Sequence, residues 1–198
     1  MPFTISNSLK KEYLFTSDRL GFRNWTVDDI EPFAQINTDA DVMQHFPKPL
    51  SYKETEDFVE RLMKHFKKHG FNYFATEILE SGELIGFIGL AYQSYESEYT
   101  PEVDIGWRLK KSAWGKGFAT EGAKQCLKFA FQRLELKQLI STCTLMNHQS
   151  EKVMQKLGMQ KAGMFKHPRL KDYPDLENCL CYKISKQEWQ ENEPNFSE

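Results

Sequence analysis

Residues 107–121 read Trp107-Arg108-Leu109-Lys110-Lys111-Ser112-Ala113-Trp114-Gly115-Lys116-Gly117-Phe118-Ala119-Thr120-Glu121. Apolar and polar side chains alternate over residues 102–109, which predicts a strand that ends inside this stretch. Apolar residues then recur at helical spacing over residues 118–134, which predicts a long amphipathic helix. The stretch is therefore a strand end, a glycine-bearing loop and a helix start, and the backbone N–H groups of such a helix start form an anion site.

The loop itself leaves two interpretations open. Glycine lets the backbone approach a phosphate closely, and Lys110, Lys111 and Lys116 add positive charge. On these features alone, an ordinary strand-to-helix turn with solvated lysines explains the loop equally well. No Gly-Lys-Ser/Thr closes it, and no G-x-G-x-x-G spacing is present, which argues against a nucleotide-binding module.

Working outward, the periodicity predicts alternating strands and helices along the chain. In chain order they are strand 19–23, helix 26–37, helix 51–70, strands 72–79, 84–92 and 102–109, helix 118–134, strand 139–145, helix 147–157, and strands 159–164 and 176–184. This order predicts an α/β (α+β) fold with one central mixed sheet of about seven strands and helices on both faces. We expect a single domain over residues 12–190, with flexible tails at 1–11 and 191–198.

Composition and charge narrow the class of protein. The 198 residues carry 26 Lys+Arg and 28 Asp+Glu, a net charge of −2, which argues against broad binding to nucleic acid or anionic membrane. No apolar run approaches the ~20 residues of a membrane span, and no signal peptide opens the chain. Cys126 and Cys143 fit core positions, and Cys179-x-Cys181 lacks a second zinc-spaced pair, so we expect no metal site. The chain therefore reads as a reduced, cytoplasmic protein.

Four short motifs, none of them specific alone, are informative together because of their order and spacing. They are Arg19-Leu20, Asp104-Ile105-Gly106-Trp107, the segment Trp114–Glu121, and Asn147-x-x-Ser150 leading to Lys156-Leu157-Gly158-Met159. Together they resemble the GNAT superfamily of acyl-CoA-dependent N-acetyltransferases over residues 14–189. The branch that the chain resembles most includes ribosomal-protein N-terminal and small-amine acetyltransferases. The resemblance implies that the mixed sheet is mostly antiparallel.

The resemblance also implies a site for acetyl-CoA. In such proteins the loop amides hold the pyrophosphate, here those of Gly115, Lys116, Gly117, Phe118, Ala119 and Thr120. The family pattern Gln/Arg-x-x-Gly-x-Gly/Ala fits Trp114-x-x-Gly117-x-Ala119, with Trp in place of the polar first residue. The backbone donors survive that departure, so binding is expected to survive as well.

Further contacts to acetyl-CoA follow from the same resemblance. Trp107, Arg108 and Leu109 would pair with the pantetheine arm like an added strand, and one of their N–H groups would polarise the thioester carbonyl. Asn147 would hydrogen-bond the pantetheine, although a plain helix cap is the alternative and both roles are compatible.

Acetyl transfer to an amine requires the amine to be neutral. Deprotonation at pH 7.4 costs about 0.5 kcal/mol for an α-amine and about 4 kcal/mol for a lysine. Asp104 is the first base candidate, because alternation places it on one face with Glu102 and Arg108. Glu102 is the second, and the competing interpretation of Asp104 is a half-exposed carboxylate paired with a lysine.

The acid and the acceptor pocket are less sharply indicated. Many GNAT enzymes carry a tyrosine acid seven residues after the Asn, and here that position is Met154. Ser150 is then the local candidate for the thiolate proton, although a polar first-turn helix residue explains it equally well. His45 and Phe46, in a proline-rich connection, and Tyr173, in a late loop, are expected to bind the acceptor.

These observations favour an N-acetyltransferase that moves acetyl from acetyl-CoA directly to a primary amine. The acceptor is expected to be a protein N-terminal α-amine or a small-molecule amine. The alternative is a non-catalytic acyl-CoA-binding sensor on the same scaffold. We expect no metal, no direct contact with nucleic acid or membrane, and a monomer or homodimer.

Overall fold

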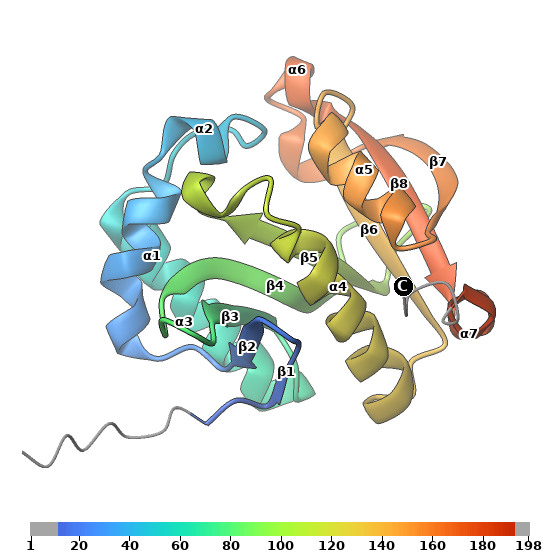
Figure 1. The fold of residues 1–198 in the computed structure, drawn as a ribbon. Coiled ribbons are helices and arrows are strands. Elements are labelled where there is room, and N and C mark those ends of the chain that lie inside the picture. The colour runs from blue at the N-terminus through green and yellow to red at the C-terminus, as the bar shows by residue number, and fades with distance from the viewer. Residues whose placement is uncertain (1–11, 193–198) are drawn as a thin grey trace, which may run out of the picture.

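The computed structural model describes residues 12–192, and an eight-stranded sheet lies at the centre of this range (Figure 1). Its order is β1-β2-β3-β4-β5-β6-β8-β7, and every neighbouring pair is antiparallel except β5 with β6. The strands are β1 (Phe15–Thr16), β2 (Leu20–Arg23), β3 (Tyr73–Ile78), β4 (Leu84–Gln93), β5 (Glu102–Leu109), β6 (Gln138–Thr144), β7 (Gln160–Lys166) and β8 (Asn178–Ser185). The mixed, mostly antiparallel sheet is confirmed. The structure has one strand more than the seven expected. This strand is β1, and its two residues are too few to show an alternation of apolar and polar side chains.

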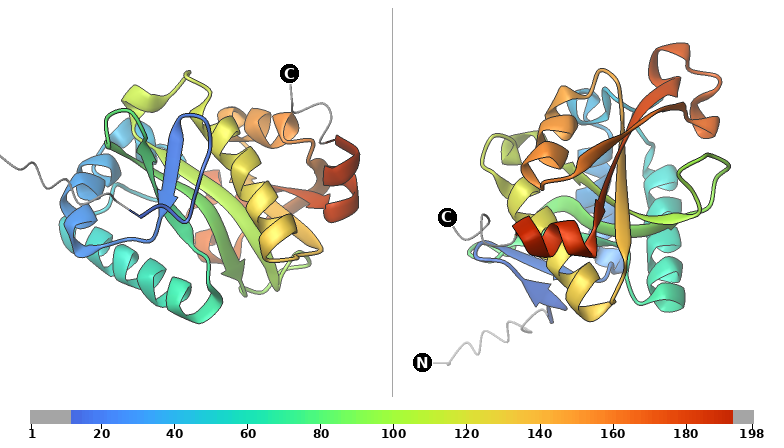
Figure 2. Two further views of the ribbon diagram at one scale, coloured as in Figure 1. Left: turned by 60° about the horizontal axis from the view of Figure 1, so that its bottom comes forward. Right: turned by 90° about the vertical axis from the view of Figure 1, so that its right-hand side faces the viewer.

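Helices cover both faces of the sheet, as predicted (Figure 2). One face carries α1 (Ile30–Asn37) and α3 (Tyr52–His69), with the short α2 (Ala40–Met43) between them in the chain. The other face carries α4 (Phe118–Lys128) and α5 (His148–Lys156). Near the end of the described chain lie α6 (Pro174–Glu177) and α7 (Lys186–Asn192), and the remaining turns are η1 (Val27–Asp29), η2 (Lys111–Ala113), η3 (Phe129–Arg133) and η4 (Pro168–Leu170).

Local sequence sets the helix ends. The Ser51 hydroxyl accepts the N–H of Glu54, whose carboxylate in turn accepts the Ser51 N–H, so α3 begins in a reciprocal capping box. At the other end, Gly70 adopts φ 77° and terminates α3. The predicted helix 118–134 is shorter as α-helix, because α4 ends at Lys128 and continues as the π-helical turn η3.

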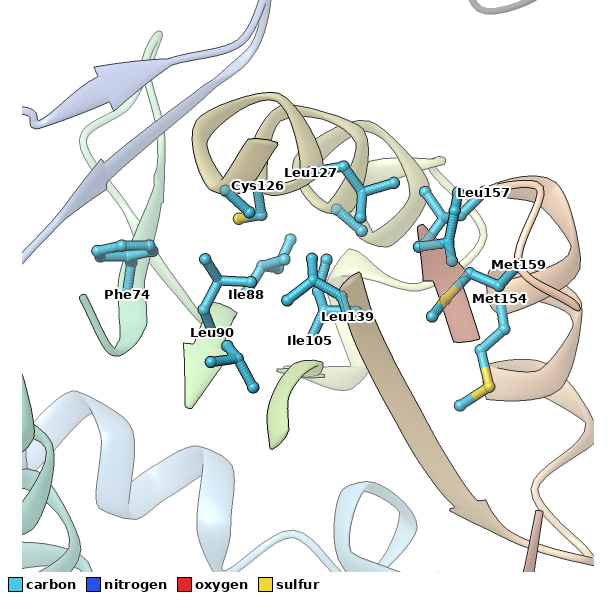
Figure 3. Close-up of a cluster of buried hydrophobic side chains, with 14 of the residues drawn as sticks. Phe74, Ile88, Leu90, Ile105, Cys126, Leu127, Leu139, Met154, Leu157 and Met159 are labelled. Carbon is cyan, nitrogen blue, oxygen red and sulfur yellow. The ribbon is translucent and has the colours of Figure 1, made fainter. Parts of the chain in front are cut away.

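Two hydrophobic cores fill the two faces. The larger core lies beneath α4 and α5, where Leu127 and Met154 meet Ile88, Ile105 and Leu139 from the sheet (Figure 3). The second core lies between the sheet and helices α1 and α3. Its members include Trp25, Phe33, Val59 and Phe87. All four cysteines are buried and free, which confirms the core positions predicted for Cys126 and Cys143.

The chain ends differ slightly from expectation. Helix α7 runs to Asn192, so residues 191 and 192 are helical and not part of a tail. Residues 1–11 and 193–198, also predicted to be flexible, lie outside the described residues. Within 12–192, no helix has the length and apolarity needed to cross a membrane, and no group of three or more His, Cys, Asp or Glu side chains is arranged to hold a metal ion.

Candidate functional site

The two central parallel strands separate from each other along their length (Figure 1). Strands β5 and β6 pair at Asp104 and Ile140, and one residue further the Ser141 hydroxyl donates to the Ile105 carbonyl at 2.8 Å. Beyond this point, no backbone pairing joins β5 to β6 in the described chain. We call this unpaired part of the two strands, residues 106–109 of β5 and 142–144 of β6, the wedge.

The hydrogen-bond phase of β5 decides which backbone groups face the wedge. The Lys110 N–H bonds to the Ile85 carbonyl on β4, so Arg108, in the same phase, also turns its backbone toward β4. Trp107 and Leu109, in the opposite phase, turn their N–H groups toward the wedge. Of the three residues predicted to meet the pantetheine arm, these two therefore offer backbone donors there.

The glycine loop leads directly into an uncapped helix. Gly115 has φ 72° and Gly117 has φ 81°, left-handed values that other residues rarely adopt. Gly117 is the N-cap of α4, no side chain caps this end, and the first helical bond runs from the Glu121 N–H to the Gly117 carbonyl at 3.0 Å. The N–H groups of residues 118–120 therefore have no intrahelical acceptor, which is the backbone arrangement that an anion site requires.

Arg19, in the turn between β1 and β2, supports this loop. Its Nη2 donates to the Lys116 carbonyl at 3.0 Å, and its Nε donates to Glu121 Oε2 at 2.7 Å. Its guanidinium also lies 4.5 Å from the centre of the Phe118 ring. The pairing neutralises the Glu121 carboxylate, which would otherwise oppose an anion at the start of α4.

The three loop lysines do not share one role. Lys110 pairs with Glu83, and Lys111 pairs with Asp41. Lys116 is exposed and forms no ion pair with any residue that the structure describes. Of the three, Lys116 alone therefore keeps its charge available beside the loop.

The start of α5 holds two further predicted residues. Asn147 Oδ1 accepts the Ser150 N–H at 3.1 Å, so the helix-cap interpretation of Asn147 is confirmed. The Asn147 Nδ2 and the Ser150 hydroxyl have no hydrogen-bond partner within residues 12–192, which leaves both open to a ligand. Met154 is fully buried in the larger core (Figure 3).

Asp104 is a buried carboxyl held by a tyrosine. Its side chain is 8% exposed, and the Tyr73 hydroxyl lies 2.7 Å and 2.8 Å from its two oxygens, to which it donates. The Gln93 amide donates to the Tyr73 oxygen at 3.2 Å. Burial raises the pKa of Asp104 to about 6, although the hydrogen bonds from Tyr73 and Gln93 act in the opposite direction. The carboxyl is thus ionised at neutral pH and can accept a proton.

The face expected for Asp104 follows from an unbroken register. Pairing of β4 with β5 continues from Gly86–Leu109 to Gln93–Glu102 without a bulge, so Asp104, Gly106 and Arg108 share one face. A Cβ at Gly106 would lie 3.1 Å from Tyr73 Cε1, which means that the tyrosine ring occupies the space of the missing side chain. Sequence reasoning did not identify Tyr73, because nothing local links it to a residue 31 positions later.

Glu102, the second base candidate, turns elsewhere. Its Oε2 accepts from Gln138 at 3.0 Å, and its Oε1 accepts the Val103 N–H at 2.9 Å. It lines a cavity of about 420 Å³ together with Gln138 and Lys183, at the end of β5 opposite the glycine loop. The structure therefore does not bring Glu102 to the wedge.

The predicted acceptor residues lie on loops at one end of the molecule, where α2 and α6 both rise (Figure 1). Phe46 follows α2, and its ring centre lies 4.2 Å from the Arg108 guanidinium. Burial lowers the pKa of His45, and so does His148 at the start of α5. Tyr173 is exposed at the start of α6.

Comparison with known proteins identifies a family for this chain. The sequence model of the family described as "Acetyltransferase (GNAT) domain" matches residues 19–160. A Bacillus subtilis (strain 168) protein named "Uncharacterized N-acetyltransferase YnaD" is 29% identical over 176 residues, which cover 88% of this chain and 98% of the relative.

Solved structures agree with the sequence comparison. A GNAT-family acetyltransferase from Bacillus anthracis superposes with a TM-score of 0.71 at 27% identity, over 87% of this chain and 98% of its own. A second structure, named "RimL- Ribosomal L7/L12 alpha-N-protein acetyltransferase in complex with Coenzyme A", has a TM-score of 0.71 at 17% identity, over 88% and 98% of the two chains. The likeness to this second structure concerns the fold.

Proposed function

The chain belongs to the acetyltransferase (GNAT) family, and from that premise we propose that it moves the acetyl group of acetyl-CoA directly to a primary amine. The proposal rests chiefly on the wedge of β5 and β6, which lies beside the loop that leads into the uncapped start of α4. A thioester with a long amide-bearing arm and a pyrophosphate suits these two features together. The four motifs that resembled the family agree with the family match.

Backbone groups supply most of the proposed binding site. The N–H groups of residues 117–120 hold the pyrophosphate, with Lys116 beside them and Arg19 fixing the loop. Trp107 and Leu109 pair with the pantetheine amides by strand addition. The Asn147 Nδ2, which the capping bond leaves unused, donates to the same arm. The RimL neighbour, whose name includes coenzyme A, supports this class of donor.

The proposed chemistry is a direct transfer in which Asp104 manages the amine proton. Asp104 takes a proton from the acceptor ammonium, directly or through one water, and the freed nitrogen attacks the thioester carbonyl carbon. The N–H of Trp107 or Leu109 polarises that carbonyl while the C–N bond forms and the C–S bond breaks. The attacking nitrogen carries a second surplus proton, which it loses as the amide forms. This proton passes through the Ser150 hydroxyl or a water to the departing thiolate, so that Ser150 ends the step protonated.

The test measures binding and turnover separately. Calorimetry with CoA reports binding, and release of the CoA thiol from acetyl-CoA across a panel of amines reports transfer. Gly117 has φ 81°, and Gly117→Asp places a side chain and a negative charge beside the backbone N–H groups at the start of α4, so it should abolish CoA binding. Gly82→Asp is the matched control, because Gly82 has φ 67° in an open turn between β3 and β4.

Two results would contradict the proposal. One is unchanged CoA affinity in a folded Gly117→Asp variant. The other is CoA binding without thiol release for any amine, which would point to the sensor alternative.

A further inference from the structure

Arg108 carries a charge that no carboxylate of the described residues neutralises. Its Nη1 donates to Asn37 Oδ1 at 2.8 Å, and its Nε is buried without an acceptor. No Asp or Glu among residues 12–192 forms an ion pair with it. Arg108 is half-buried, and charges withdrawn from water are paired as a rule, because desolvation of an unpaired ion is costly. The lack of a carboxylate partner for the Arg108 guanidinium therefore calls for an explanation.

Three phenylalanines surround the guanidinium. Its carbon lies 4.2 Å from the ring centre of Phe46, 5.5 Å from that of Phe87 and 5.6 Å from that of Phe58, and we call these three the aromatic cage. Aromatic faces attract a cation but do not neutralise it. Burial lowers the pKa of Arg108 to about 10, so the group still carries its charge at neutral pH.

The cage adjoins the proposed base on the same face of β5. Tyr73, which holds Asp104, stacks on Phe87 of the cage with ring centres 4.8 Å apart. Asp104 and Arg108 are four residues apart, so their Cα atoms are about 13 Å apart along the strand. Phe46, on the outer side of the cage, is 37% exposed, so a ligand can reach this part of the molecule from solvent.

A second arginine, Arg169, acts on the Asp104 carboxyl. Arg169 is exposed over the Tyr95 ring at 5.5 Å, and its positive charge reaches the Asp104 carboxyl. It forms no ion pair with the residues that the structure describes. Its positive charge near Asp104 disfavours a polycationic acceptor and favours an anionic one.

We infer that the acceptor carries a carboxylate on the same molecule as its amine, and that the Arg108 guanidinium in the aromatic cage binds this carboxylate. The inference rests on the proposed function. Nη2 donates no hydrogen bond within the described chain, and a guanidinium matches a carboxylate better than any other side chain does. The free amino acids and acidic peptides share this chemistry.

The experiment compares matched acceptors that differ in one carboxylate. Methionine is paired with methioninamide, glutamate with glutamine, and Gly-Glu-amide with Gly-Gln-amide, so the first two pairs report free amino acids and the third reports a peptide. In at least one pair, wild-type kcat/KM should favour the carboxylate by about 30-fold or more, chiefly through KM. Arg108→Met should bring that ratio close to one, and Arg108→Lys should retain part of it.

Arg61→Met is the matched control. Arg61 is exposed on α3 and lies 5.5 Å from the same Phe58 ring, so its loss should leave the ratio unchanged. A structural role of Arg108 alone would lower activity toward both members of a pair and keep their ratio. If Arg108→Met does not fold, Arg108→Lys alone decides, by a fall of about tenfold in the ratio.

Three outcomes would overturn the inference. Transfer to amines with no preference for the carboxylate in any pair would overturn it and leave the proposed function intact. A preference that survives Arg108→Met, or survives Arg108→Lys undiminished when the Met variant is unfolded, would do the same. Absence of both CoA binding and transfer to any amine would overturn the proposed function, and the inference with it.

Discussion

Tyr73→Phe should move the acidic limb of the pH–rate profile to higher pH. The Tyr73 hydroxyl lies 2.7 Å and 2.8 Å from the Asp104 oxygens and stabilises the ionised carboxylate, whose pKa is about 6. A hydrogen bond to a charged group contributes about 1.5–3 kcal/mol, which corresponds to about 1–2 units of pKa. Its removal raises the pKa of Asp104, so the base becomes ionised only between about pH 7 and 8.

The consequence is a pH-dependent loss of activity. With a wild-type pKa of about 6, roughly three-quarters of the Asp104 carboxyls are ionised at pH 6.5, and with a pKa near ~7.5 about a tenth are. The variant's kcat/KM should therefore fall about eightfold at pH 6.5 and recover toward wild type near pH 9. The phenyl ring keeps its stacking on Phe87, so the substitution preserves the packing at this position.

The assay is kcat/KM from pH 5.5 to 9 with one acceptor, for wild type and variant. Because the acceptor amine titrates identically in both series, the ratio of the two profiles isolates the enzyme group. Tyr92→Phe serves as the control, since Tyr92 is exposed and stacks on His69 with ring centres 5.6 Å apart. A wild-type-to-Tyr73→Phe ratio that stays constant across pH would refute Asp104 as the titrating base.

Three further predictions follow from the same site. Asp104→Asn should lower kcat by about 100-fold at pH 7, with little change in CoA affinity by calorimetry and with a smaller loss at high pH, where the amine deprotonates unaided. Arg19→Gln should raise KM for acetyl-CoA about tenfold at unchanged kcat in steady-state kinetics, because the Lys116 carbonyl loses its charged donor. No cysteine should become acetylated when the protein is incubated with acetyl-CoA alone, because all four are buried and burial raises the pKa values of their thiols. Mass spectrometry measures such adducts, and an adduct that forms rapidly and transfers its acetyl group to an added amine would disprove direct transfer.

The sequence predicted the features that depend on near neighbours. Alternation over residues 102–109 placed Asp104 and Arg108 on one face, and the register of β4 with β5 keeps them there. The capping pattern at Ser51 and the glycine loop at residues 115–117 likewise describe backbone conformations that a few adjacent residues determine. These are the parts of the fold and the site that local physical chemistry controls.

The sequence did not predict the hydrogen-bond and ion-pair partners of the site residues, because these partners depend on tertiary packing. The acceptor of Arg108 is Asn37, 71 positions away, and Arg19 reaches the Lys116 carbonyl across 97 positions. Lys110 and Lys111 add positive charge to the loop in the sequence, but Glu83 and Asp41 pair with them in the structure. The sequence shows which charged residues a site contains. Whether their charge is available to a ligand depends on which oppositely charged side chains the fold places beside them.

The proton balance explains why a base can matter in this site more than an acid. A thiolate whose conjugate thiol has a pKa near 8.5 takes a proton from neutral water with a gain of about 2 kcal/mol at pH 7, so the transfer tolerates Met154 in place of a tyrosine acid. An ammonium resists its loss of a proton, at a cost from about 1 kcal/mol for an α-amine to nearly 5 kcal/mol for a lysine-like amine at pH 7. A carboxyl with a pKa of about 6 accepts that proton far more readily than an exposed aspartate with a pKa near 3.9. The burial that raises the pKa of Asp104 therefore shifts the transfer in the direction that the harder of the two proton steps requires.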